Sequence, residues 1–115
     1  MDLYFQGQGW LNKGRTPNNV GQARGFFDRA LSADPNNVDA LVGSAWAGTV
    51  EGIHLFVTDR LAAFAAAEAK LTKALSSVPD HARGHAVLGF VYIFTRRAPE
   101  GIAECEHALA LVTWN

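Results

Sequence analysis

Apolar residues recur every three or four positions along most of the chain, which is the spacing of one face of an α-helix. The clearest case is the stretch 20–32, where Val20, Ala23 and Phe27 fall on one face. Pro35 ends this stretch because proline cannot continue a helix. The pattern therefore predicts an all-α fold of five clear helices and a short sixth. The predicted helices are 8–13, 20–32, 38–50, 59–77, 81–95 and a last one that starts near Pro99.

An internal repeat organises these helices. Three segments, starting at residues 23, 67 and 101, share a small residue, a larger residue four positions later and an Ala-Leu pair three positions after that. The larger position holds Phe27, Leu71 or Cys105. Two copies close on a proline, Pro35 or Pro79, and the third closes on threonine. Self-similarity of this kind indicates a stack of repeated helical units.

The repeat resembles the second helix of the tetratricopeptide repeat (TPR), a helical hairpin of about 34 residues. The resemblance divides the chain into repeats of about 8–37, 38–81 and 82–115. The first repeat has an incomplete first helix, and the second carries an insertion of about ten residues around 52–64. The resemblance implies antiparallel helix pairs stacked in a right-handed superhelix, which serves as a scaffold for recognition. Residues 29–43 are more loosely similar to TPR regions of bacterial multidomain regulators of adenylate-cyclase and transcriptional type.

The first seven residues, MDLYFQG, resemble the protease-cleavage sequence ENLYFQG of recombinant expression. We therefore expect residues 1–7 to be an expression-tag remnant outside the fold, and the TPR domain to span 8–115.

The chain has 10 Lys and Arg against 11 Asp and Glu, a net charge of -1. Asp2 is the only charged residue of the first seven, so the rest is neutral.

This neutrality changes the list of expected partners. It disfavours nucleic acid, whose binding needs a basic face. The apolar stretches are much shorter than a membrane span, so no membrane partner is expected. The single cysteine, Cys105, allows no internal disulfide and favours a cytoplasmic location.

The resemblance also maps a binding surface onto the chain. TPR proteins bind a protein or peptide segment on the concave surface formed by the first helix of each repeat. In this chain that surface is mostly apolar, and exposed apolar patches mark contacts. The insertion, with its apolar residues 53–57, either folds back into this groove or leaves it open to a partner. The mapped positions are Asp39, Val42, Trp46, Thr49, Val50, Arg83, Ala86, Phe90, Ile93 and Phe94.

An alternative interpretation is an assembly module. TPR arrays usually end in a polar capping helix, and the sequence stops at Asn115 without one. The open end would expose Leu109, Val112 and Trp114, which a homodimer or another domain of a larger bacterial regulator would cover.

Catalytic and metal-binding patterns are weak. His81 and His85 have the i, i+4 spacing of two metal ligands on a helix, but no third ligand stands at a motif spacing. Cys105 occupies a core position of the repeat, where a thiol is inert. No acid, base and nucleophile come together. The sequence therefore predicts a non-catalytic protein with no catalytic residue, no metal and no cofactor.

Overall fold

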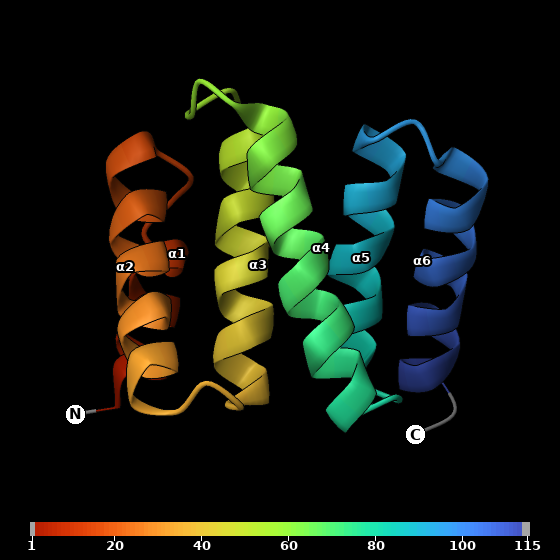
Figure 1. The fold of residues 1–115 in the computed structure, drawn as a ribbon, viewed down its shortest axis with the longest axis horizontal. Coiled ribbons are helices and arrows are strands. Elements are labelled where there is room, and N and C mark those ends of the chain that lie inside the picture. Colours follow the sequence, from red (N-terminus) through yellow and green to blue (C-terminus); the bar gives the residue numbers. More distant parts are fainter. Residues whose placement is uncertain (1, 114–115) are drawn as a thin grey trace.

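The computed structural model describes residues 2–113, which form a row of six α-helices joined by short turns (Figure 1). No strand occurs within these residues, as the all-α prediction requires. The helices are α1 (Leu3–Asn12), α2 (Pro17–Ala33), α3 (Val38–Ile53), α4 (Arg60–Ser77), α5 (Ala82–Phe94) and α6 (Ala98–Thr113).

The start of each of the first five helices is set by a side chain that accepts a hydrogen bond from a backbone N–H in the first turn. These N-cap residues are Asp2, Thr16, Asn37, Asp59 and His81. Thr16 is followed by a proline at the first helical position, where the missing N–H costs nothing. For this reason α2 begins three residues before the predicted stretch 20–32.

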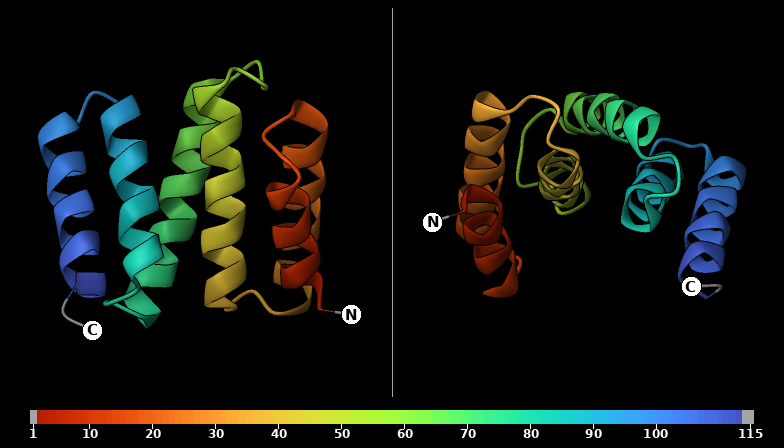
Figure 2. Two further views of the ribbon diagram at one scale, coloured as in Figure 1. Left: turned by 180° about the vertical axis from the view of Figure 1, so that it is seen from behind. Right: turned by 90° about the horizontal axis from the view of Figure 1, so that it is seen from below.

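Helices that are adjacent in sequence pack against each other, which gives the pairs α1–α2, α3–α4 and α5–α6. The first helices of these pairs also meet, α1 with α3 and α3 with α5. Seen from behind, α1 lies in front of α2 and α3 in front of α4, whereas α5 and α6 lie side by side, and the view from below shows that the row is curved (Figure 2). Helix α3 lies at the centre, because it contacts α1, α2, α4 and α5.

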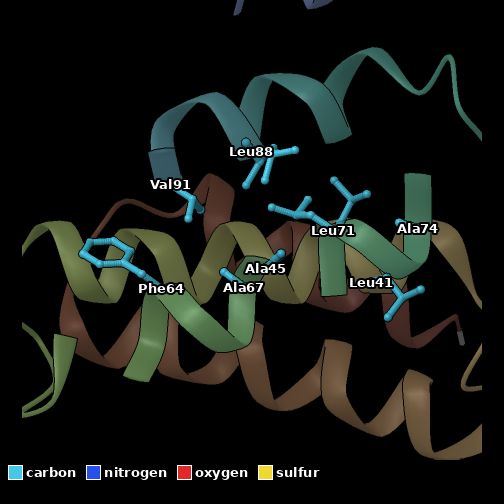
Figure 3. Packing of buried hydrophobic residues seen from close by; sticks show 10 residues of the cluster. Leu41, Ala45, Phe64, Ala67, Leu71, Ala74, Leu88 and Val91 are labelled. Carbon is cyan, nitrogen blue, oxygen red and sulfur yellow. The ribbon is translucent and has the colours of Figure 1, made fainter. Parts of the chain in front are cut away.

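Two hydrophobic clusters hold the row together. The larger one joins α3, α4 and α5, with Phe64, Leu71 and Val91 fully buried between them (Figure 3). The second joins α2 and α3 around Phe27, which is also fully buried. A Cβ on Gly7 or Gly43 would lie 2.6 to 2.8 Å from the Phe27 ring, so these glycines form the socket that holds it. The core therefore follows the apolar helix faces that the sequence indicates.

Residues 3–7, which the resemblance to a cleavage sequence places outside the fold, form the first half of α1. Tyr4 lies against Phe27, with ring centroids 5.7 Å apart, and Gly7 is buried beneath the same ring. The predicted short helix 8–13 is thus longer and starts at Leu3. Residues 3–7 are thus part of α1, and Tyr4 and Gly7 pack against the second cluster.

The pair α5–α6 is closed by two glycines. A Cβ on Gly101 would lie 2.6 Å from the carbonyl oxygen of Gly89, and one on Gly89 would lie 2.5 Å from Cys105 Sγ. The backbones therefore come close here, and side chains one turn away on the two helices are brought into contact.

Candidate interaction surface

The apolar part of the predicted surface lies on α3 and α5 and is partly open to solvent. Trp46 and Phe90 meet across the two helices, with ring centroids 5.6 Å apart. Phe90, Ile93 and Phe94 each keep 38% to 40% of their surface exposed. Phe94 stacks over the buried Phe64, with ring centroids 6.2 Å apart, so it is anchored from below. We call Trp46, Phe90, Ile93 and Phe94 the aromatic face.

Three of the ten mapped positions do not lie on the surface, contrary to the prediction. Val42, Thr49 and Val50 are at most 1% exposed. Thr49 Oγ1 donates a 2.6 Å hydrogen bond to the carbonyl oxygen of Ala45 and is satisfied inside the helix. The reason is the central place of α3: with neighbours on four sides, it has little outer surface left. These three residues, which the resemblance maps onto an open surface, therefore lie in the core.

Charged residues lie beside the aromatic face. The Arg15 guanidinium sits 5.2 Å from the centre of the Trp46 ring. Arg83 donates a 3.3 Å hydrogen bond from Nη1 to the hydroxyl of Tyr4 and so links α5 to α1. Asp39 is exposed and lies 3.5 Å from His81 Nε2. Of the mapped positions, Asp39 and Arg83 thus have polar partners outside the aromatic face, and Ala86 is half-buried on α5.

The insertion leaves the aromatic face open. Its loop, residues 54–59, lies at one end of the α3–α4 pair (Figure 1). Leu55 points into solvent and is 64% exposed, whereas Phe56 packs against the cluster around Phe27. Ile53 packs against the larger cluster as the last residue of α3. Of the two alternatives for this segment, the structure has the one in which Phe90 and its neighbours stay uncovered.

The far end of the row carries a second apolar surface. Leu109 and Val112 on α6 are 64% and 61% exposed. They border a groove of about 470 Å³ between α5 and α6, whose other walls are Ala86, Arg83, Cys105 and Ala108. The predicted assembly residues Leu109 and Val112 are thus on the surface, and Trp114 lies outside the described residues.

A network of hydrogen bonds and ion pairs links α2 of the first pair to α3 of the second. Arg24 Nε donates a 2.6 Å hydrogen bond to Glu51 Oε1, and Glu51 is only 6% exposed. Ser44 Oγ donates a 2.7 Å hydrogen bond to Asp28, which also lies 3.6 Å from Arg24. The network borders a pocket of about 360 Å³ between α2, α3 and α4. Because these charges are paired with one another, the network serves to join α2 to α3.

A histidine cluster between α5 and α6 was not predicted. The i, i+4 pair splits: His81 caps α5, whereas His85 is buried and contacts Glu104. His107 follows Glu104 by three positions on α6, which places both on one helix face. That spacing was visible in the sequence, but the packing of His85 against it depends on how α5 and α6 meet.

Comparison with known proteins gives no indication of function, so the aromatic face and the groove between α5 and α6 are the main guides to it. No protein-family model matches the chain, and no curated protein matches it. Within residues 2–113, no helix is both long and apolar enough to cross a membrane.

Proposed function

We propose that the chain is a non-catalytic protein–protein interaction module of TPR type, which binds a protein or peptide segment on the aromatic face. The observation that carries the proposal is the exposure of Phe90, Ile93 and Phe94 beside Trp46 on first helices of successive pairs. The order of helix pairs and the repeated sequence pattern support the TPR assignment.

The chemistry of the face suits a partner with apolar anchors. Large aromatic residues dominate binding energies at protein interfaces, because they bury much area at little cost in side-chain entropy. Phe94 and Trp46 are held by Phe64 and Phe90, so the face is preorganised for binding. Arg15, which lies beside the Trp46 ring, favours a segment that carries a negative charge beside its apolar residues.

The test is a peptide-array or phage-display screen with the purified protein, followed by affinity measurement on the selected peptides. Phe90→Ala and Ile93→Ala should each weaken binding by more than about tenfold, which corresponds to the 1.4 kcal/mol or more lost at a hot-spot residue. Trp46→Ala is a supporting variant only, because Trp46 also packs against both hydrophobic clusters.

The matched control is Leu61→Ala on α4, which removes a leucine that is 68% exposed and lies outside the aromatic face. This variant should bind like the parent protein. Circular dichroism should show all variants equally helical. Selected peptides that bind the Phe90 and Ile93 variants as tightly as the parent protein would reject the proposal.

A second candidate function, an assembly module of a larger bacterial regulator, is favoured by the groove between α5 and α6. Its apolar rim, Leu109 and Val112, is more exposed than the aromatic face. Further apolar surface in this groove would be buried by a second copy of the chain or by another domain, with a gain of roughly 25 cal/mol per Å².

Light scattering at several protein concentrations tests this candidate. A dimer that dissociates in the Leu109→Glu variant, with unchanged helicity, is the expected result for self-assembly. The control is Ile102→Glu, which adds the same charge at another exposed position of α6. A monomeric mass at all concentrations would exclude homodimerisation through this groove.

A further inference from the structure

His85 is held between two groups that can only accept hydrogen bonds. Its Nε2 lies 2.6 Å from the carbonyl oxygen of Pro79, and its Nδ1 lies 2.5 Å from Glu104 Oε2. The side chain is mostly buried, so water cannot replace either partner freely. A neutral imidazole has only one N–H, so one of its two nitrogens would direct a lone pair at an oxygen. The contact is favourable only if that nitrogen carries a proton or binds another cation.

A cation at Nδ1 meets this need. If Nε2–H donates to Pro79, the 2.5 Å contact between Nδ1 and Glu104 holds a shared proton. A Zn²⁺ ion bound to both atoms would replace this proton and hold them about 3.3 Å apart, which a small movement of the Glu104 side chain allows.

A third ligand stands next to this pair. The His107 ring centroid lies 4.2 Å from that of His85. Glu104 and His107 are three residues apart on α6, so both side chains project from one face. One ligand atom of each of His85, Glu104 and His107 lies within 4.8 Å of the other two.

We propose that His85, Glu104 and His107 form a binding site for Zn²⁺ that bridges α5 and α6. Two imidazole nitrogens and one carboxylate are a donor set that zinc accepts, with a fourth position left for water. The same set suits Mg²⁺ and Ca²⁺ poorly, because these ions prefer oxygen ligands.

The surroundings of His85 match those of a zinc ligand. A metal-bound histidine nearly always donates its other N–H to a carboxylate, a backbone carbonyl or water, and this orients the ring. The Pro79 carbonyl takes that role for Nε2 and leaves Nδ1 for the metal. His107 is exposed and Glu104 is partly exposed, so an ion can enter from solvent.

Bound zinc should stabilise the α5–α6 pair. An ion that binds the folded state links His85 on one helix to Glu104 and His107 on the other, and the binding energy adds to the stability of the fold. Zn²⁺ should therefore raise the Tm of the protein, by an amount that grows with the logarithm of the free Zn²⁺ concentration above its Kd, and Mg²⁺ should not.

The test is isothermal titration of Zn²⁺ alone into metal-stripped protein without a polyhistidine tag, with thermal melts as a second readout. The parent protein should bind one Zn²⁺ per chain. His107→Ala and Glu104→Gln should each weaken binding by more than about tenfold, since even loss of a second-shell partner costs 10- to 100-fold. His107 is exposed, so its removal should leave the helicity intact.

Two controls separate this site from other zinc ligands. His54→Ala removes an exposed histidine near Phe56, far along the chain from the site, and should bind like the parent protein. Cys105→Ala removes the single thiol and should also keep the affinity. The proposal is overturned if millimolar Zn²⁺ gives neither heat nor a Tm shift, or if the His107 and Glu104 variants bind as tightly as the parent protein. Loss of binding in the Cys105 variant would overturn it as well.

Discussion

The first and last helix pairs use the same sequence pattern in different ways. In α2 the large position of the repeat is Phe27, which is fully buried in a socket of glycines from α1 and α3. In α6 the corresponding residue is Cys105, which is partly exposed beside Gly89. The first pair is thus joined by a large side chain, whereas the last pair is joined by the close approach of two backbones.

The two pairs also differ in their neighbours. Within the described residues, α6 contacts only α5, so Leu109 and Val112 stay exposed at the end of the row. The close approach of α5 and α6 at the two glycines brings His85 and Glu104 together in the interface. The first pair thus contributes a large buried side chain to the core, whereas the last pair also presents apolar side chains and a histidine cluster that are available for binding.

Phe27→Ala should have the largest effect on stability. It removes a fully buried ring and leaves its glycine socket empty, with an expected loss of about 3–5 kcal/mol in the free energy of unfolding. Urea or thermal unfolding measures the loss. Phe26→Ala, next to it but only partly buried, is the control and should cost much less. A loss below about 1.5 kcal/mol at Phe27 would contradict the socket.

Gly101→Ala should have the next largest effect. The new methyl group would collide with the backbone of Gly89 and force α5 and α6 apart, at a cost of about 1–3 kcal/mol. The higher helix propensity of alanine offsets up to about 1 kcal/mol of this. The expected result is a net destabilisation.

Gly25→Ala is the matched control for that change. Nothing lies within 4 Å of a Cβ on Gly25, so only the propensity gain remains and the protein should become more stable by roughly 0.5–1 kcal/mol. Opposite signs for the two substitutions would support the backbone contact. A stabilising Gly101→Ala would show that the helices are not joined in this way.

Much of the fold follows from local signals in the sequence. Prolines and N-cap residues such as Asn37 and Asp59 mark helix starts, and apolar residues at three- and four-residue spacing mark the faces that become the core. The helix predicted over 59–77 is observed as Arg60–Ser77. These signals act within one or two turns of helix, so a single sequence is enough to read them.

The candidate site was harder to predict because it depends on long-range packing. The resemblance maps Val42 and Val50 onto an open surface, but both are buried because α3 contacts four other helices. Tyr4 was set aside with the first seven residues, although it packs against Phe27 and binds Arg83. The contact of His85 with Glu104 depends on the close approach of α5 and α6 at Gly89 and Gly101. No local sequence pattern predicts this approach.

Cys105→Ala should have the smallest effect and completes the comparison with Phe27. The thiol is only partly buried, and its loss removes about as much apolar surface as one methylene group, which is worth about 0.8 kcal/mol when fully buried. The expected loss is therefore below about 1 kcal/mol, several times less than for Phe27→Ala. Unfolding of both variants under the same conditions, in the presence of a chelator, gives the ratio directly. Equal losses at the two positions would mean that the last pair also depends on the side chain at this position, and not mainly on the close approach of the two backbones.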